Sequence, residues 1–395
     1  MSSSIPRLHH RADGPTGAPP LLLGPSLGTS LALWDPQVPA LARHHRVVRY
    51  DLPGHGGSPA ELLDAGASVA DLAALVLELA DGLGIDRFAY AGVSLGGAVG
   101  TWLAVHRPER VASLALVCSS ARFGEPDGWR ERAALVRSEG VGAVVSSSLE
   151  RWFTPGFRES ATARALVADL RATAAEGYAA CCDALAGFDV RGALPRIAVP
   201  TLAVAGRDDP ATPPSHARLL ADAVPSASLT ELAGAAHLAG AERPGPVLSA
   251  LLTHLAEAAP GTEDEPPTDD DGRRAAGSAV RRSVLGDAHV DRAQERTSAF
   301  TEVFQDFITR YAWGEVWTRP GLPRATRSCI TLTALTARGH HDELAMHVRA
   351  ALRNGLTREE IGEVLLQTAV YCGVPAANSA FAVADRVLRE EETDD

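Results

Sequence analysis

Short apolar runs alternate with helical patterns along the first 258 residues. The runs that we predict to be buried strands are PPLLLG (19–24), HRVVRYD (45–51), RFAYAGV (87–93), VASLALVCS (111–119) and PTLAVAG (200–206). SVADLAALVLELADGLG (68–84) has the period of a helix, with Ser68 as its N-cap. This alternation is typical of a mostly parallel α/β sheet. Residues 122–190 have helical periodicity without a strand, and we expect them to form a helical lid.

The pattern of buried elements is interrupted between residues 259 and 282. From Glu263 to Asp271 the chain holds six acids and two prolines, with no basic and no apolar side chain. Such a segment stays solvated because no hydrophobic gain offsets the entropy of ordering it. We therefore predict an acidic flexible linker at 259–282, between a first domain at 1–258 and a second domain at 283–395.

No strand pattern follows the linker. One helical face of the segment 291–313 carries a stripe of apolar side chains, namely Phe300, Val303, Phe304, Phe307, Ile308 and Tyr311. Thr357 and Glu360 form a capping box, and Gly373 ends the helix that they begin. We expect an all-α domain of about five helices. Its apolar stripes are generous for a domain of this size, which favours a homo-oligomer formed through this domain.

Composition and charge exclude several classes of protein. The chain has 395 residues, of which 46% are hydrophobic and 22% charged, as in soluble globular proteins. Its formal charge of −12 argues against nucleic acid as a partner, because phosphate binding needs a basic face. No apolar run reaches the ~18 residues of a membrane helix. The five cysteines include no C-x-x-C pair and the N-terminus lacks an apolar signal, so we expect a cytoplasmic protein.

The segment AGVSLGGAVG contains the pattern G-x-S-x-G at Gly92 to Gly96, between an apolar strand and an apolar helix. A serine on such a sharp strand-to-helix turn is forced outward, and its neighbours must be small. The helix N-terminus behind it favours negative charge on a substrate oxygen. A purely structural glycine turn is the alternative. We interpret Ser94 as a nucleophile.

A nucleophilic serine needs a base, and the base needs an acid that orients it. In this strand-to-helix arrangement the acid and the base follow the serine in the order Asp, His. AVAGRDDPATPP offers Asp208 and Asp209 at the end of a strand, and the spacing favours Asp209. His237 lies in a loop of small residues after the next strand, whereas His216 and His254 lie in predicted helices and are interpreted as surface residues.

The second domain contains the segment GHHDELAMHVRAALRNG. His340, Glu343 and His347 stand at i, i+3 and i+7, so one helical face could present all three as an acid–base cluster. Two other readings remain open. The three side chains could form an ordinary polar solvent face, or a His/Glu/His metal site.

The first domain resembles the α/β-hydrolase family, and within it the 3-oxoadipate enol-lactonases. The resemblance rests on GPSLGTSLALWDPQVPAL, YDLPGHGGSP, GVSLGG, GRDDPATPP and AAHLAGAERP. It implies an oxyanion hole made by the backbone N–H groups of Leu27 and Leu95. GPSLGT stands where many relatives carry His-Gly. This departure lies in the segment that contains Leu27, so it concerns the assignment of Leu27 to the oxyanion hole more than that of Leu95. The serine at the turn argues against a dehalogenase, which would have an aspartate there.

Residues 283–395 resemble the 4-carboxymuconolactone decarboxylases through SVLGDAHVDRA, FITRYAWGEVWTRPGL, RSCITLTAL and PAANSAF. That family shares its helical fold with the alkylhydroperoxidases. Aligned on His347, His340 and Glu343 stand where the peroxidases have their two cysteines. The resemblance therefore excludes a dithiol reaction in this alkylhydroperoxidase-like domain and leaves acid–base chemistry.

Together the two resemblances imply a bifunctional enzyme of the 3-oxoadipate (protocatechuate) pathway that acts on small lactone carboxylates. It would need no cofactor and no metal, because the substrate serves as its own electron sink. Each site should hold a cation for a substrate carboxylate: Arg122, Arg130 or Arg151 in the lid, and Arg324 or Arg327 in the helical domain. Trp129 and Trp152 are expected to line the lactone pocket.

Two rival functions stay open at this point. In the first, a general esterase or lactonase is fused to a non-catalytic helical module that only mediates oligomerisation. In the second, the hydrolase acts on another lactone and its fusion to the helical domain is incidental.

Overall fold

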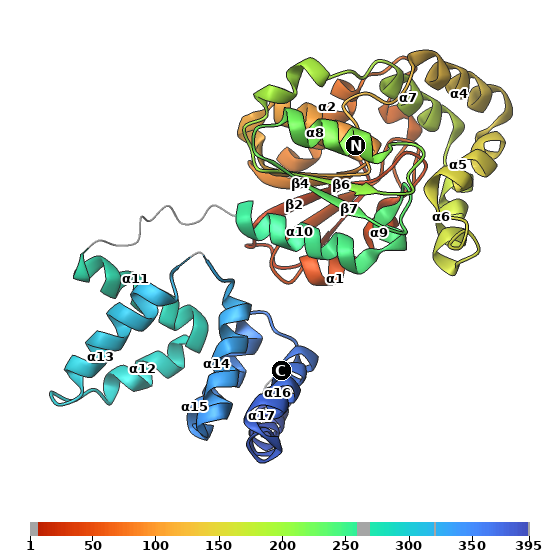
Figure 1. The fold of residues 1–395 in the computed structure, drawn as a ribbon. Coiled ribbons are helices and arrows are strands. Elements are labelled where there is room, and N and C mark those ends of the chain that lie inside the picture. The colour runs from red at the N-terminus through yellow and green to blue at the C-terminus, as the bar shows by residue number, and fades with distance from the viewer. Residues whose placement is uncertain (1–6, 259–268, 320, 394–395) are drawn as a thin grey trace, which may run out of the picture. The chain divides into compact units, whose positions relative to one another are not determined.

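The computed structural model describes residues 7–258, 269–319 and 321–393. The chain divides into two compact units, Met1–Ala259 and Pro260–Asp395 (Figure 1). The first unit is an α/β fold and the second is largely helical, as the sequence predicts. None of the described helices is long and apolar enough to cross a membrane.

The first unit is built on a seven-stranded sheet with the order β1-β3-β2-β4-β5-β6-β7. All neighbouring strands are parallel except β1 and β3. The strands are β1 (His10–Asp13), β2 (Pro20–Gly24), β3 (Arg46–Tyr50), β4 (Phe88–Val93), β5 (Val111–Val117), β6 (Thr201–Gly206) and β7 (Ala227–Leu232). The central strands β4 and β6 are buried at every position, because helices cover both faces of a parallel sheet. The edge strand β1 has the polar sequence HRAD, so hydrophobicity did not predict it.

Ten α-helices surround this sheet in the described residues. They are α1 (Val38–Leu41), α2 (Val69–Gly82), α3 (Leu95–His106), α4 (Pro126–Glu139), α5 (Val145–Trp152), α6 (Ala161–Ala172), α7 (Ala175–Ala186), α8 (Pro214–Ala223), α9 (Ala239–Glu242) and α10 (Pro244–Ala258). Figure 1 shows α2 and α8 on one side of the sheet and α10 on the other. The helices α4 to α7 occupy the segment where the sequence predicts a lid, and α4 packs on α7 and α5 on α6.

The described residues of the second unit form seven α-helices and one π-helical segment at Thr309–Val316. The α-helices are α11 (Asp270–Leu285), α12 (Asp287–Glu295), α13 (Glu302–Ile308), α14 (Arg324–Arg338), α15 (His341–Arg353), α16 (Arg358–Cys372) and α17 (Val374–Thr393). The π-helical segment packs closely on α11. A Cβ at Gly277 would lie 2.0 Å from the carbonyl oxygen of Thr309, so only glycine fits there.

The prediction of a flexible linker at 259–282 is wrong for its second half. Residues 259–268 lie outside the described residues, but from Asp270 the chain is helical. The side chain of Asp269 caps this helix by accepting a hydrogen bond from the backbone N–H of Gly272 at 2.7 Å. The acids that suggested a solvated linker also favour a helix N-terminus. The buried Val284 and Leu285 then anchor the helix within the unit.

The apolar stripe of the second unit buries little of its surface. Phe300 is 94% exposed, Val303 77% and Phe304 60%, and Phe307 and Tyr311 are also exposed. The core of the unit is formed instead by α14 to α17, around buried side chains such as Leu332, Leu344 and Leu365. The helical period is correct from Val303 to Tyr311, but residues 296–301, which include Phe300, are not helical. The stripe is also not a face packed within the described chain.

Candidate active sites

Ser94 lies on a strained turn between β4 and α3. Its backbone angles are φ 54° and ψ −114°, a conformation that side-chain-bearing residues rarely adopt. The turn requires glycine at its flanks. A Cβ at Gly92 would lie 2.3 Å from the carbonyl carbon of Gly96, and a Cβ at Gly96 would lie 2.5 Å from that of Gly24. The backbone N–H of Ser94 donates to Val117 at 3.0 Å, which fixes the turn against β5.

Asp209 and His237 form a buried pair in the loops that follow β6 and β7. His237 Nδ1 lies 2.8 Å from Asp209 Oδ2, and both side chains are almost fully buried. Asp209 also accepts hydrogen bonds from the backbone N–H groups of Ala211 and Thr212 and from the Thr212 hydroxyl. Burial raises the pKa of Asp209, but the charge of His237 and these hydrogen bonds outweigh it, so the pKa is lowered. The carboxylate can thus orient the imidazole while staying ionised.

The structure distinguishes the histidines and aspartates between which the sequence left a choice. Asp208 is exposed, and it is Asp209 that contacts His237. The interpretation of His254 as a surface residue is wrong. This histidine on α10 is only 6% exposed, and burial lowers its pKa to about 4. It occupies the inward face of α10, which a helical period alone does not distinguish from the outward face.

The loop that contains Leu27 is positioned by a buried histidine that the sequence analysis did not single out. His55 Nε2 accepts a hydrogen bond from the backbone N–H of Gly28 at 3.0 Å, while its Nδ1 lies 2.9 Å from the carbonyl oxygen of Pro53. Burial lowers the pKa of His55 to about 4, so the ring stays neutral. Within the described chain, the N–H groups of Leu27 and Leu95 have no hydrogen-bond partner. They therefore remain available to an oxyanion.

Three of the predicted lid residues lie in different environments. Trp152 is 5% exposed, and its ring lies 3.2 Å from the position of a Cβ built on Gly28, so it packs beside the loop of Leu27. Trp129 is part-buried and donates its ring N–H to a backbone carbonyl within the lid. Arg130 is exposed and forms an ion pair with Asp127 at 2.7 Å. Of these three, only Trp152 lies against the loop expected to form the oxyanion hole.

An arginine that the sequence analysis did not single out lies near the loop of Leu27. Arg132 on α4 donates to the hydroxyl of Tyr178 at 2.9 Å and to the hydroxyl of Ser148 at 2.7 Å. Its guanidinium also lies over the Tyr178 ring, 5.6 Å from the centroid. That ring lies 3.3 Å from the position of a Cβ built on Gly28. Arg132 has no carboxylate partner among the described residues, whereas Arg122 is paired with Glu125.

Hydrogen bonds attach the lid to the loop of His237. Leu238 donates its backbone N–H to the carbonyl oxygen of Trp152 at 3.0 Å. The buried Glu242 accepts from the backbone N–H of Thr154 at 3.0 Å and from that of Ala236 at 2.6 Å. Because these contacts immediately flank His237, the end of α5 and the catalytic loop form one packed unit.

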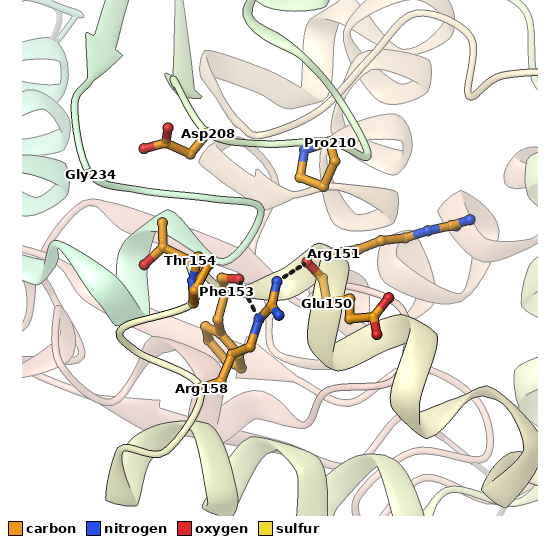
Figure 2. A pocket seen from close by; sticks show the side chains of 9 residues that line it. Glu150, Arg151, Phe153, Thr154, Arg158, Asp208, Pro210 and Gly234 are labelled. Atoms are coloured by element: carbon orange, nitrogen blue, oxygen red, sulfur yellow. Dashed lines mark hydrogen bonds between the residues drawn. The ribbon is translucent and has the colours of Figure 1, made fainter.

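A pocket of about 710 Å³ lies outside this arrangement (Figure 2). Asp208, Pro210, Phe153 and Thr154 are among the residues that line it, and neither Ser94 nor His237 does. Figure 2 shows Arg151 pointing away from the other labelled side chains. This pocket is therefore separate from the Ser94–His237–Asp209 arrangement, and its size does not identify it as the catalytic site.

The three residues predicted as an acid–base cluster in the second unit differ in burial. His347 on α15 is only 9% exposed, whereas His340 and Glu343 are exposed near the start of that helix. Burial lowers the pKa of His347 to about 4, with a further decrease from His289 and an opposing effect of Glu343. His347 thus lies within the electrostatic range of both Glu343 and His289.

The cations predicted for this unit are engaged elsewhere. Arg324 donates to the hydroxyl of Ser283 at 2.9 Å, and Arg327 donates to the carbonyl oxygen of Arg319 at 2.8 Å. Within the described ranges, no three His, Cys, Asp or Glu side chains are grouped in a way that could hold a metal ion.

Comparisons with known families agree with this two-part architecture. A family model described as alpha/beta hydrolase fold matches residues 19–244, and the model of the carboxymuconolactone decarboxylase family matches residues 302–386. The chain therefore belongs to the α/β-hydrolase fold family in its first unit and to the carboxymuconolactone decarboxylase family in its second. Both resemblances inferred from the sequence are confirmed.

Two relatives and one solved structure show how similar each unit is to particular proteins of these families. The first unit is 36% identical to 3-oxoadipate enol-lactonase 2 of Acinetobacter baylyi over 239 residues, which are 60% of this chain and 88% of the relative. The second is 48% identical to 4-carboxymuconolactone decarboxylase of the same organism over 121 residues, 31% of this chain and 90% of the relative. The crystal structure of the enol-lactonase from Burkholderia xenovorans is 38% identical. It superposes with a TM-score of 0.61, covering 63% of this chain and 96% of that one.

Proposed function

We propose that this chain catalyses two consecutive steps of the 3-oxoadipate (protocatechuate) pathway. The second unit would decarboxylate 4-carboxymuconolactone to 3-oxoadipate enol-lactone, and the first unit would hydrolyse that enol-lactone to 3-oxoadipate. One observation carries the proposal: each unit covers nearly the whole length of a relative with one of these two activities. The product of one relative's reaction is the substrate of the other's.

The decarboxylation needs no group beyond the substrate and acid–base residues. When the bond to the departing CO₂ breaks, its electron pair moves through the ring C=C into the lactone carbonyl. The resulting dienolate is furan-like, and protonation of the carbon next to the carbonyl gives the enol-lactone. The protein has to stabilise this oxyanion and supply the proton. We assign the proton transfer to His347 with Glu343, and His340 to the rim of the site, because only His347 is buried.

The hydrolysis follows from the arrangement around Ser94. The Ser94 hydroxyl would attack the lactone carbonyl as its proton passes to His237, which Asp209 holds in the required tautomer. The N–H groups of Leu27 and Leu95 would donate hydrogen bonds to the developing oxyanion. Ring opening releases an enol that tautomerises to the ketone. Water activated by His237 then cleaves the acyl-enzyme.

We further propose Arg132 as the residue that binds the carboxylate of the enol-lactone. Its guanidinium has only hydroxyl and ring partners in the described chain, and Tyr178 places it near the loop of Leu27. A charge-assisted pair with a carboxylate is stronger than a bond to a hydroxyl. In Arg132→Gln, the KM for the enol-lactone should therefore rise, whereas Arg130→Gln should leave it unchanged.

We propose that the protein is cytoplasmic and self-associates through its second unit. All five cysteines are free, as expected in a reducing compartment. Phe300, Phe304, Phe307 and Tyr311 form an exposed apolar surface, which we call the stripe face. Monomeric proteins rarely expose so many large apolar side chains together, and a second copy of the same face would cover them.

The decisive test of function supplies the full chain with 4-carboxymuconolactone labelled at the γ-carboxyl group and follows labelled CO₂ and 3-oxoadipate by NMR. We expect both products in equal amounts. Hydrolysis of supplied enol-lactone without any release of CO₂ would support the rival reading, in which the second unit only mediates oligomerisation. Hydrolysis of simple esters but not of the enol-lactone would support a general esterase.

A further inference from the structure

The helix α12 presents a row of basic side chains to a pocket of about 280 Å³ in the second unit. His289, Arg292 and Arg296 stand at i, i+3 and i+7, so they share one face of the helix. The other residues that line this α12 pocket are Ala293, Thr297, Thr301 and Gln305. In the described part of the unit, neither Arg292 nor Arg296 has an ion-pair partner. The lining therefore contains no negative charge.

A buried arginine on α11 contacts Gln305, one of the residues that line this pocket. Arg281 is only 9% exposed, and it donates to the side-chain oxygen of Gln305 at 3.1 Å and to the Thr309 hydroxyl at 3.4 Å. Its Nε is buried without a hydrogen-bond partner, and no carboxylate among the described residues neutralises its charge. Its neighbour Arg282, by contrast, is paired with Asp287 and Asp291.

A buried charge without a partner is costly, and native proteins pair such a charge with a carboxylate or a bound ion. A second buried polar atom is also unsatisfied, because His347 Nδ1 has no hydrogen-bond partner among the described residues. Burial lowers the pKa of His289, and the nearby Arg281, Arg292 and Arg353 lower it further. The two histidines and these arginines thus share one positive field.

We propose that the α12 pocket binds a carboxylate of the decarboxylation substrate through Arg281 and Arg292, and so places the lactone ring beside His289 and His347. The ligand class is a small lactone that carries carboxylates. This inference rests on the proposed decarboxylase function and assigns its substrate site to residues on α11 and α12.

The chemistry determines which carboxylate the arginines hold. The departing carboxylate loses its charge as it becomes CO₂, so an ion pair with it would stabilise the substrate more than the transition state and slow the reaction. The carboxylate on the side chain keeps its charge from substrate to product. Arg281 and Arg292 therefore bind this retained carboxylate. Such uniform binding affects KM more than kcat, and it also holds the product.

The test compares Arg292→Gln with Arg338→Gln in the full-length protein. Arg292 is exposed, so its loss leaves the fold intact. Arg338, at the end of α14, is also exposed and has no ion pair in the described part of the unit. We expect the KM for 4-carboxymuconolactone to rise about 10-fold or more in Arg292→Gln, as for the loss of a charge-assisted hydrogen bond, with kcat nearly unchanged. Arg338→Gln should match the wild type in both constants.

A second measurement uses the product. In a Ser94→Ala background the enol-lactone is not consumed, and we expect it to inhibit decarboxylation competitively. Arg292→Gln should raise its inhibition constant by the same factor as KM. An unchanged KM and an unchanged inhibition constant in Arg292→Gln would overturn the site and leave the proposed function standing. Arg281→Lys, which keeps the charge but not the planar fork, should have an intermediate KM.

The two proposals fail in different ways. If the wild type does not decarboxylate the lactone, the proposed function fails, and NMR signals of the histidine rings then test the pocket directly. Signals assigned with His289→Gln and His347→Gln should shift when 4-carboxymuconolactone is added to the wild type but not when it is added to Arg292→Gln. Shifts without turnover would retain the pocket as a carboxylate site, and no shifts would overturn it.

Discussion

The two units satisfy the polar groups at their sites in different ways. In the first unit, Asp209 accepts four hydrogen bonds and His55 uses both ring nitrogens, so the site is complete within one chain. In the second unit, Arg281 Nε and His347 Nδ1 are buried and have no hydrogen-bond partner among the described residues. A site that is preorganised without ligand suits covalent catalysis by a fixed triad. The second unit instead has buried polar groups that its described residues leave unsatisfied.

The two units also differ in the exposure of their large apolar side chains. The large apolar side chains exposed in the first unit are scattered, and each is less than half exposed, such as Leu219 at 42%. In the second unit Phe300, Val303 and Phe304 are neighbours and more than half exposed. Scattered exposed leucines need no explanation, but a continuous stripe does. The proposed self-association and the proposed anion site therefore both concern the second unit.

The largest effect should come from Ser94→Ala. Loss of the nucleophile in a serine hydrolase lowers kcat by about 10⁶. We expect enol-lactone to accumulate from 4-carboxymuconolactone while CO₂ release continues at the wild-type rate, as NMR of the reaction mixture would show. A parallel loss of decarboxylation would mean that the two units do not work independently.

The next effect distinguishes the two aspartates. Asp209→Asn should lower kcat for the enol-lactone by about 10⁴, because the carboxylate fixes the histidine tautomer. Asp208→Asn is the matched control, since Asp208 is exposed and has no contact with His237. Steady-state hydrolysis by both variants checks this. A larger loss in Asp208→Asn would remove Asp209 from the triad.

In the second unit, His347→Ala should lower decarboxylation by about 10² or more, the usual contribution of a general acid or base. His340→Ala is the control at an exposed position of the same segment. Both variants should keep wild-type hydrolysis of supplied enol-lactone. Activity should also persist in a metal chelator, and loss of activity that a divalent metal restores would favour the His/Glu/His metal site instead.

A pH effect should report on the buried His55 of the first unit. The pKa of His55 is about 4 when folded and 6.5 when unfolded, so unfolded protein takes up the proton first as the pH falls. The stability from neutral His55 is therefore complete above pH 6.5 and is lost toward pH 4. We expect a loss of about 3 kcal/mol over this window. His55→Gln keeps a hydrogen-bond acceptor and a donor but does not take up this proton. Between pH 6.5 and pH 4, its free energy of unfolding should therefore fall by about 3 kcal/mol less than that of the wild type. An equal fall in both proteins would contradict the assignment to His55.

The smallest effect concerns the stripe face. Phe304→Ser should weaken self-association about 10-fold or more, because burying a Phe side chain contributes about 1.5–3 kcal/mol. Sedimentation velocity over a concentration series measures it. Leu219→Ser is the control for an exposed apolar residue of the first unit and should leave the oligomer unchanged. A wild-type protein that stays monomeric at high concentration would contradict the stripe face as an interface.

Sequence patterns located the parts of the first site that follow from chain order. Ser94, Asp209 and His237 follow the strands β4, β6 and β7, and parallel strands bring their carboxyl ends to one edge of the sheet. His55 and Arg132 could not be found in this way. The role of each depends on neighbours that are remote in sequence, Gly28 for the first and Tyr178 for the second.

In the second unit the same patterns gave the helices but not the direction of their faces. An amphipathic stripe has the same period whether it packs against its own chain or against another copy, so the exposure of Phe304 could not be predicted. His340 and His347 are likewise equivalent by spacing. The structure distinguishes them, because His340 is the exposed N-cap of α15 whereas His347 lies on the buried face of that helix. The acids from Asp269 were ambiguous because they suit both a linker and a helix N-terminus.

The conformation of Ser94 has a consequence for evolution. A side-chain-bearing residue at its φ and ψ destabilises the fold by about 1–3 kcal/mol, which is a sizeable share of the stability of a domain. Ser94→Gly should therefore raise the melting temperature of the first unit while removing its activity. Selection for thermal robustness alone would replace this serine. Its presence means that turnover, rather than durability, has been the stronger constraint on this position.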